Sequence, residues 1–290
     1  MLAYGPIPLM TRPGRPGPLR RLAFAGAWYA GDRDRLARDV DEALAAAADR
    51  VAVVRAAVAP HAGLRYSGRV AAWSYRALAA APPEAIVLVG PSHYVEFPGC
   101  AMLDRGAVET PWGESPVAEA LADRLHDETP LVREARPEVH AGEHSLELQL
   151  PFIGRLFPGV PLLPILMGQQ SRSVAFALGA ALAGAVAGAP VALVASSDLS
   201  HYHDSATARA LDAVVLDRLG HGDAEGLMRA IEREPGHACG GGPMVAVLEA
   251  ARRLGLTAGG VLAYADSGDV SGDHSRVVGY ASAAYGAPAP

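Results

Sequence analysis

Apolar and polar positions along the chain predict alternating helices and strands. Between residues 32 and 48, Leu36, Val40 and Leu44 recur at four-residue intervals, which indicates an amphipathic helix with Asp32 in position to cap it. Further helices are predicted over 68–81, over 115–128 with Ser115 as the cap, over 144–150 up to a break before Pro151, over 206–222, and over 243–255 with Pro243 in the first turn.

The strands stand out as apolar runs between these helices. Segments 160–168 and 190–196 are apolar throughout instead of alternating, which is typical of strands buried on both faces. Further strands are predicted over 51–59, 85–90, 259–266 and 276–285. Strands and helices that alternate in this way indicate an α/β sandwich, with helices on both faces of a largely parallel central sheet.

The pattern predicts one domain over residues 21–285, because this stretch contains no repeat and no linker. Residues 1–20 are rich in Pro and Gly and carry their arginines after the apolar part, so we expect a flexible lead-in and not a secretory signal. Met1 and Met10 both remain candidate starts, and 286–290 form a short tail. The uncharged stretch 174–195 is long enough for a membrane span, but it is mostly Ala and Gly and Pro190 interrupts it. We therefore expect a helix, a turn and a strand there.

Composition narrows the class of protein. Half of the 290 residues are apolar, the net charge is −6 and the arginines are scattered, which argues against a nucleic-acid-binding protein. Two cysteines make no disulfide framework and fit a cytoplasmic location. Cys100 lies in an apolar run and is expected in the core, whereas Cys239 lies among glycines, where its thiol is accessible to a ligand.

Polar side chains follow four of the predicted strands. Because ligands of open α/β sheets bind beyond the carboxyl ends of parallel strands, we expect these side chains to meet at one edge. In chain order they are His61, then Ser92 and His93, then Ser197, Asp198 and His201, and finally Asp266, Asp269 and Asp273.

Together with Cys239, two of these histidines suggest a metal site. Neutral imidazoles and a thiolate are ligands for Fe, Cu and Zn, and His61, His93 and Cys239 would leave open positions, as a catalytic metal requires. Asp198 precedes His201 by three residues and is close enough to orient its ring.

Several of these residues also have a simpler structural interpretation. A lone loop histidine is commonly bonded to backbone, Cys239 could pack under the helix that begins at Pro243, and Asp269 and Asp273 are residue types that favour turns. A cysteine nucleophile at position 239 with a histidine base is a minority alternative. His144 and Glu147 are three residues apart and share a helical face, which suits a pocket wall or a capping interaction.

Nine motifs occur in an order that resembles the Memo family, whose bacterial and archaeal members are called AmmeMemoRadiSam system protein B. They are "FAGAWYAGD", "PHAGLRYSG", "GPSHY", "ETPWGE", "EHSLELQLPF", "PILMG", "SSDLSHY", "CGGGP" and "SGDVSGDHSRVVGYA". The resemblance covers about residues 21–285 and implies a fold similar to class III extradiol dioxygenases, which use non-haem iron(II). The resemblance does not explain the choice of Trp112 within "ETPWGE" or of His237 just before "CGGGP".

The resemblance also implies roles for individual residues. His61 and His93 match the two histidine ligands, Cys239 stands at the third ligand position, and His201 matches the acid/base histidine, with Asp198 beside it. We expect Ser92, His144, Glu143 and Tyr66 to bind substrate. The dioxygenases have a carboxylate as third ligand, so a thiolate makes Cu(I) or Zn alternatives to the first choice, Fe(II).

Three functions are compatible with the strand-end residues, the donor set and the resemblance, and the sequence leaves open whether the protein is an enzyme. The first is dioxygenase-like redox chemistry on a small aromatic or diol substrate. The second is a non-catalytic module that binds a small molecule or peptide and works with AMMECR-type and radical-SAM partners. The third is handling of Cu(I) or iron. Neither nucleic acid nor a membrane is expected as a partner, and the oligomeric state is undetermined.

Overall fold

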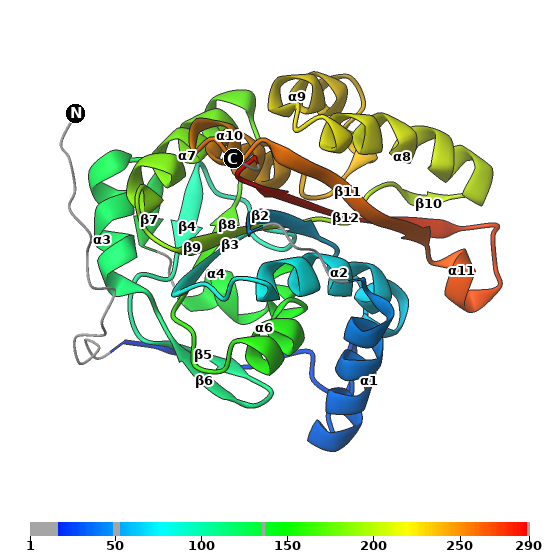
Figure 1. Ribbon diagram of the computed structural model, residues 1–290, viewed down its shortest axis with the longest axis horizontal. Coiled ribbons are helices and arrows are strands. Elements are labelled where there is room, and N and C mark those ends of the chain that lie inside the picture. The colour runs from blue at the N-terminus through cyan, green and yellow to red at the C-terminus, as the bar shows by residue number, and fades with distance from the viewer. Residues whose placement is uncertain (1–16, 49–52, 135–136, 289–290) are drawn as a thin grey trace.

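The computed structural model describes residues 17–48, 53–134 and 137–288. Within these residues, nine strands form one large sheet in the order β10-β12-β2-β9-β3-β8-β4-β7, with β11 paired to β12 (Figure 1). The three strands β1, β5 and β6 form a separate small sheet. The centre of the large sheet, β2-β9-β3-β8, is parallel throughout.

The strands have the following bounds: β1 Leu19–Arg20, β2 Val54–Ala59, β3 Ala85–Pro91, β4 Cys100–Met102, β5 Ala107–Thr110, β6 Gly113–Pro116, β7 Val132–Glu134, β8 Leu162–Met167, β9 Val191–Ser196, β10 His201–His203, β11 Ala258–Asp266 and β12 Val277–Gly286. Strands β3, β8 and β9 are buried along their whole length, as their continuous apolar sequences predict.

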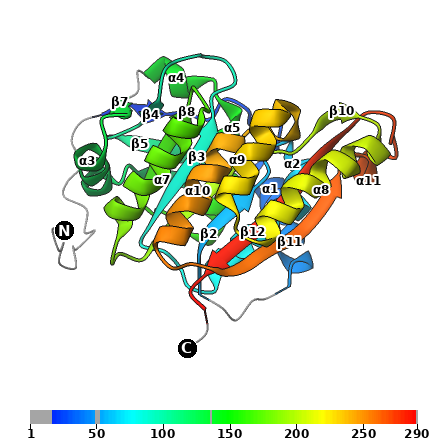
Figure 2. The same ribbon diagram turned by 90° about the horizontal axis from the view of Figure 1, so that it is seen from above.

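The helices cover both faces of the sheet. They are α1 Arg33–Ala46, α2 Leu64–Ala79, α3 Glu119–Glu128, α4 Pro137–Ala141, α5 His144–Glu147, α6 Leu150–Leu156, α7 Arg172–Val186, α8 Ser205–Gly220, α9 Ala224–Arg233, the 3-10 turn η1 Pro235–His237, α10 Gly241–Arg253 and α11 Gly268–Ser271. Helices α7, α8, α9 and α10 lie over one face, and α1, α2 and α6 lie on the opposite side (Figures 1 and 2).

The predicted α/β class with helices on both faces is confirmed, and so are several local details. The Asp32 side chain caps α1 by accepting a hydrogen bond from the backbone N–H of Arg35, and Leu36, Val40 and Leu44 are buried. The apolar stretch 174–195 forms most of α7, a turn and β9. No helix among the described residues is both long and apolar enough to cross a membrane.

Two local predictions are wrong. Ser115 does not cap a helix: it lies buried in β6, paired with Val108, and α3 begins only at Glu119. The helix predicted over 144–150 ends earlier, because α5 stops at Glu147. Pro151 lies in the first turn of the next helix, α6, where no backbone N–H is needed. Outside its parallel centre the large sheet also contains antiparallel pairs, of β12 with β2, β10 and β11 and of β4 with β8.

The folded part of the chain begins before residue 21 and ends after residue 285. Residues 1–16 of the expected lead-in and residues 289–290 of the tail lie outside the described residues. Leu19 and Arg20 already form β1, which pairs with β5, and β12 continues to Gly286.

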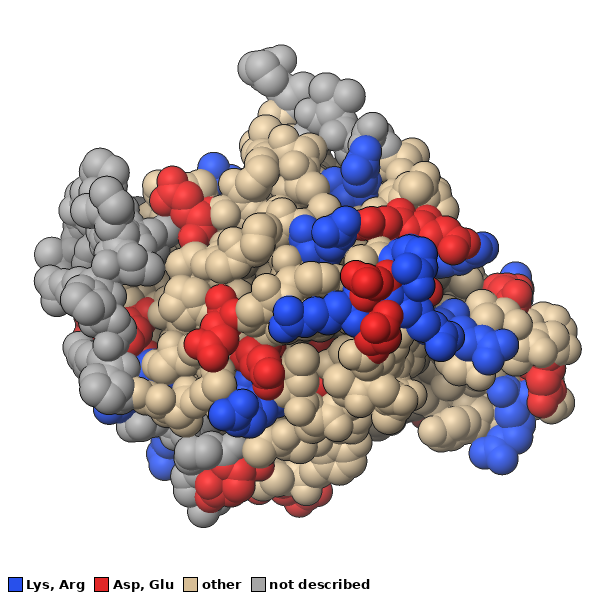
Figure 3. All heavy atoms as spheres, turned by 90° about the horizontal axis from the view of Figure 1, so that it is seen from below, with Lys and Arg blue, Asp and Glu red and all other residues tan. Residues whose placement is uncertain are grey.

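On the face seen in Figure 3, positive and negative side chains are interspersed. One ion pair at the surface joins Asp41 of α1 to Arg155 of α6.

Candidate metal centre

The carboxyl ends of the central strands carry the candidate ligands. His61 follows β2 by two residues, and His93 follows β3 by two. Cys239 lies between η1 and α10, on a segment that reaches the same edge because its backbone N–H donates to the carbonyl oxygen of Asp198, beyond β9. Three segments distant in sequence therefore meet there.

The predicted convergence of His61, His93 and Cys239 is present in the structure. One ligand atom from each of these residues lies within 4.8 Å of the others. The Sγ atom of Cys239 is 3.2 Å from Nε2 of His61, and the His61 and His93 rings meet edge to face with centroids 5.3 Å apart. His61 is 1% exposed. The three donor atoms are thus close enough to share one ion.

Hydrogen bonding fixes the tautomer of His61. The hydroxyl of Ser196 donates its single proton to the carbonyl oxygen of Ser145, at 2.6 Å. Its oxygen lies 2.9 Å from Nδ1 of His61 and must accept there, since the hydroxyl has no second proton to give. Nδ1 therefore carries the hydrogen, and the lone pair of Nε2 faces Cys239.

His93 is oriented in the same way by a carboxylate. Its Nδ1 lies 2.9 Å from Oε1 of Glu143, whose Oε2 accepts from the backbone N–H of His93. Hydrogen bonds from His93 and Ser145 lower the pKa of Glu143 to about 2, against the opposing effect of burial, so the carboxylate is ionised and accepts only. Nε2 of His93 is left as the free donor atom. Such carboxylate–histidine pairs are characteristic of metal ligands.

The electrostatics of the cluster favour neutral imidazoles. Burial, reinforced by His93, lowers the pKa of His61 to about 3, so its ring is uncharged at neutral pH. Burial and the nearby carboxylate of Asp198 raise the pKa of the Cys239 thiol. A cation between these groups would act in the opposite direction and favour the thiolate, because a coordinated thiol loses its proton.

A second group adjoins the first. Ligand atoms of His93, Glu143 and His144 also lie within 4.8 Å of one another, and the His93 and His144 rings stack with centroids 4.4 Å apart. Nδ1 of His144 is 3.1 Å from the hydroxyl of Tyr94, and the Trp28 ring packs against the His144 ring at 4.6 Å. His144 and Glu143 therefore border the metal centre, while Tyr94 and Trp28 are neighbours that the sequence reasoning did not single out.

Asp198 and His201 lie at the same edge but are arranged differently from the expectation. Among the described residues, the Asp198 carboxylate accepts from the backbone N–H groups of His61 and Ala62 and makes no hydrogen bond to the His201 ring. It acts on His201 through its charge: burial lowers the pKa of His201, and Asp198 partly offsets this. Burial raises the pKa of Asp198 to about 6. His201 also interacts electrostatically with His61 and His93.

Ser92 and Tyr66 have other contacts. The hydroxyl of Ser92 donates to the carbonyl oxygen of Val95 and so shapes the loop after β3. Tyr66 lies in the first turn of α2, is 37% exposed, and packs under the guanidinium of Arg65. These observations leave their predicted role in substrate binding open.

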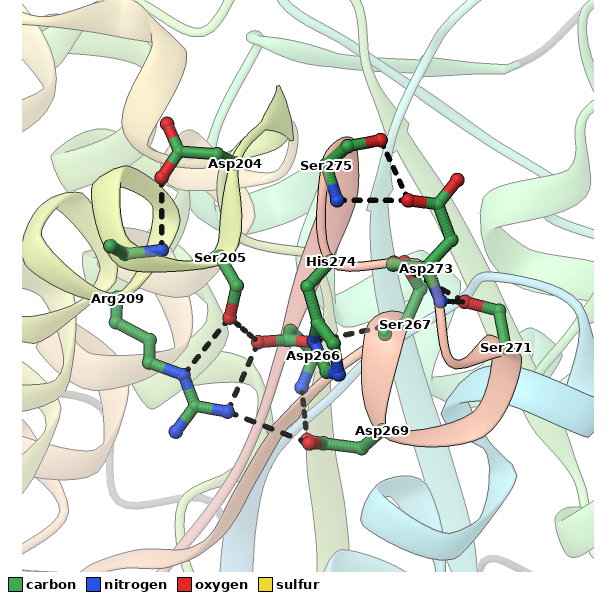
Figure 4. A network of polar contacts seen from close by, with 12 residues as sticks. Asp204, Ser205, Arg209, Asp266, Ser267, Asp269, Ser271, Asp273, His274 and Ser275 are labelled. Atoms are coloured by element: carbon green, nitrogen blue, oxygen red, sulfur yellow. Dashed lines mark hydrogen bonds and ion pairs between the residues drawn. The ribbon is translucent and has the colours of Figure 1, made fainter.

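The acidic residues after β11 form a network of their own (Figure 4). The buried Asp266 carboxylate accepts from the Ser205 hydroxyl, from Arg209 and from the backbone N–H of Gly268, while Asp269 accepts from the backbone N–H of Asp266. This network joins the first turn of α8 to the loop between β11 and β12. Its hydrogen bonds hold this loop against α8, and they do not include the histidines of the candidate metal centre.

Glu147 has a role that sequence reasoning did not specify. Its buried carboxylate accepts from Arg20, from the backbone N–H groups of Ala23 and Phe24, and from the Tyr29 hydroxyl. It thereby fastens the loop that carries Trp28. The signal was present, since "FAGAWYAGD" and "EHSLELQ" are both motifs, but their contact spans more than 100 residues.

Comparisons with known proteins agree with this architecture. A family model described as "Memo-like protein" matches residues 20–284. The MEMO1 family protein MTH_45 of Methanothermobacter thermautotrophicus is 34% identical, with 91% of this chain and 99% of that protein covered. A MEMO1 family protein of Methanosarcina acetivorans is 37% identical, covering 91% and 98%. The crystal structure of uncharacterized protein JW3007 from Escherichia coli K12 superposes with a TM-score of 0.52, at 18% identity, over 78% of this chain and 99% of that one, which supports the fold alone.

Proposed function

The chain belongs to the Memo-like protein family, and from this premise we propose that it binds one metal ion through His61, His93 and Cys239 and uses it for dioxygenase-like chemistry. The observation that carries the proposal is the pairing of both histidines at Nδ1, with Ser196 and with Glu143. This leaves the Nε2 atom of each ring free, and one ligand atom of each histidine lies within 4.8 Å of the Cys239 sulfur.

The donor set fits a transition metal. Two neutral imidazoles and one thiolate suit iron, copper or zinc, and three protein ligands leave coordination positions open. Hard cations such as magnesium prefer oxygen ligands and are disfavoured. Iron(II) is the first choice, and when bound it would supply the redox chemistry that cleavage of a small aromatic or diol substrate by dioxygen requires.

The residues around the centre have their own tasks. His201 is kept neutral by burial and can take a proton from a substrate hydroxyl. Asp198 holds the loop of His61 by accepting two backbone N–H groups, and its charge stabilises the protonated form of His201. His144, stacked on His93, offers a polar edge to a ligand, and the Trp28 ring shields that edge from water.

Elemental analysis tests the metal site directly. Protein purified without air and supplied with iron(II) should retain about one metal ion per chain, and His61→Ala should lose it. His126→Ala is the control, because this histidine is exposed on α3. Retention of metal by His61→Ala would contradict the proposed site.

The chemistry is tested separately. Iron-loaded protein mixed with a panel of catechols and dioxygen should develop the absorbance of ring-cleavage products. His201→Gln should bind iron normally but react at least about 100-fold more slowly, because general base catalysis contributes roughly this factor or more. Silence across the panel at full iron occupancy would remove the dioxygenase part and leave the metal site standing.

The thiolate favours one alternative function, the handling of copper(I) or iron. Sulfur ligands select Cu(I) over harder ions. In competition with a Cu(I) chelator, the wild-type chain should hold copper more tightly than Cys239→Ala. Equal affinity of the two proteins would exclude this alternative.

A further inference from the structure

A second hollow lies away from the metal centre, between α8, α9 and η1. Its volume is about 260 Å³, and its wall includes three arginines, Arg218, Arg229 and Arg233, together with His237. No acidic side chain is part of this wall. Helices α8 and α9 appear side by side in Figures 1 and 2, on the outer face of the molecule.

His237 is the unusual member of this wall. It is 7% exposed, and its Nδ1 atom is buried without a hydrogen-bond partner among the described residues. A buried ring nitrogen of this kind is uncommon, because leaving a polar atom without a partner costs about 1–3 kcal/mol. The ring lies at the end of η1 and forms part of the wall of the hollow.

The charge of the three arginines is only partly balanced. Arg233 has no partner among the described residues, and Arg218 reaches Asp217 and Asp223 at 3.4 and 3.5 Å. Asp223 is occupied as the cap of α9, since its carboxylate accepts from the backbone N–H of Gly226 at 2.8 Å. Arg233 is therefore the guanidinium in this wall that no carboxylate of the described residues pairs with.

The third arginine shares its acidic partner with another. Arg229 pairs with Glu225 at 3.2 Å, but Glu225 also pairs with Arg172, at the shorter distance of 2.6 Å. Arg172 also pairs with Glu232, at 2.7 Å, so Glu225 and Glu232 together serve Arg172 and Arg229.

We propose that this hollow binds a phosphate group, as inorganic phosphate or as a small phosphomonoester. Guanidinium groups match the oxygen geometry of phosphate, and a doubly charged anion balances several arginines better than a single carboxylate does. A volume of about 260 Å³ admits a phosphate with a small substituent. The site is independent of the proposed metal chemistry, although η1 places His237 two residues before Cys239.

Calorimetric titration of the full chain tests the proposal, with inorganic phosphate and glycerol phosphate as separate probes in a buffer free of phosphate. Either probe should bind saturably with one site per chain, and Arg233→Gln should weaken binding about tenfold through loss of one charge-assisted interaction. Because Arg233 is exposed and unpaired, this variant should fold normally. Arg38→Gln is the matched control, since Arg38 is also an exposed helix arginine without a partner among the residues that the structure describes.

A third variant separates this site from the metal centre. Cys239→Ala should bind phosphate as the wild type does, whatever its metal content. The proposal is overturned if neither probe binds saturably, if Arg38→Gln weakens binding as much as Arg233→Gln, or if binding disappears in Cys239→Ala. Failure of the metal assay would not affect any of these three results.

Discussion

Nε2 of His61 lies 3.2 Å from Sγ of Cys239, although 178 positions separate the two residues in the sequence. The contact exists because β2 and β9 are parallel neighbours, so their carboxyl ends lie together, and the Cys239 backbone is bonded to the loop that follows β9. The partly buried thiol thus faces a neutral imidazole, an arrangement that suits a pair of metal ligands.

Replacement of Cys239 should therefore cost metal affinity more than stability. Cys239→Ala removes one of three proposed ligands, and we expect metal affinity to fall by about 100-fold or more, beyond the effect of losing a supporting hydrogen bond. Competition titration against a chelator of known affinity measures this. Cys100→Ala is the control, because Cys100 is a free, buried cysteine in β4 and does not belong to the candidate metal-binding group. Equal losses in both variants would refute the assignment.

Ser196 should matter through the tautomer of His61. Ser196→Ala removes the acceptor that holds hydrogen on Nδ1, so the ring can rotate or change tautomer, and metal affinity should fall by about 10–100-fold. Ser74→Ala is a suitable control, since Ser74 is also a fully buried serine but bonds to the backbone of β2 and to Ser282. If Ser196→Ala bound metal as tightly as wild type, the tautomer argument would fail.

Periodicity was sufficient to predict the fold class and the central parallel strands, because β3, β8 and β9 are buried at every position and, except for Ser196, carry no polar side chain. It was not sufficient for Ser115, whose sequence context suits a helix cap. Pairing of Ser115 with Val108 in the small sheet decides its conformation, and that contact is tertiary. The direction of β12 is likewise set by its hairpin with β11.

The candidate site likewise contains residues that the sequence could predict and residues that it could not. His61 and His93 could be found because each follows a buried strand, where a histidine in a glycine-bearing loop is conspicuous. The partners Ser196 and Tyr94 could not, since their importance depends on which ring nitrogen they meet. The expected bond between Asp198 and His201 is absent among the described residues because backbone N–H groups after β2 reach the carboxylate.

Acid should destabilise the protein through its buried histidines, and His140 offers a clean measurement. Burial lowers the pKa of His140 to about 4. The unfolded chain takes up this proton near pH 6.5 and the folded chain does not, so stability is complete above about pH 6.5 and falls as pH decreases towards 4. The loss amounts to about 1.4 kcal/mol per pH unit, or roughly 3 kcal/mol in total.

Urea unfolding between pH 7 and pH 4.5 checks this expectation. His140→Leu should show a shallower loss of stability with acid than the wild type, because it has no proton to take up when it unfolds. His126→Leu should keep the wild-type slope, since His126 is exposed. Parallel slopes for wild type and His140→Leu would show that His140 does not contribute.

Glu147 supplies the sharpest test of how the loop over the site is held. Glu147→Gln leaves the guanidinium of Arg20, which is 7% exposed, without its charged partner, and breaking a buried pair in this way costs about 3–5 kcal/mol. Glu42→Gln breaks the exposed pair with Arg69 and should cost less than about 1 kcal/mol. Urea unfolding compares the two.

Because Glu147 also holds the backbone of Ala23 and Phe24, Glu147→Gln should in addition free the Trp28 ring from His144. This should change tryptophan fluorescence before unfolding, an effect that Trp28→Phe would abolish. Identical stability losses for the two glutamate variants, with unchanged fluorescence, would mean that the loop is held by other contacts.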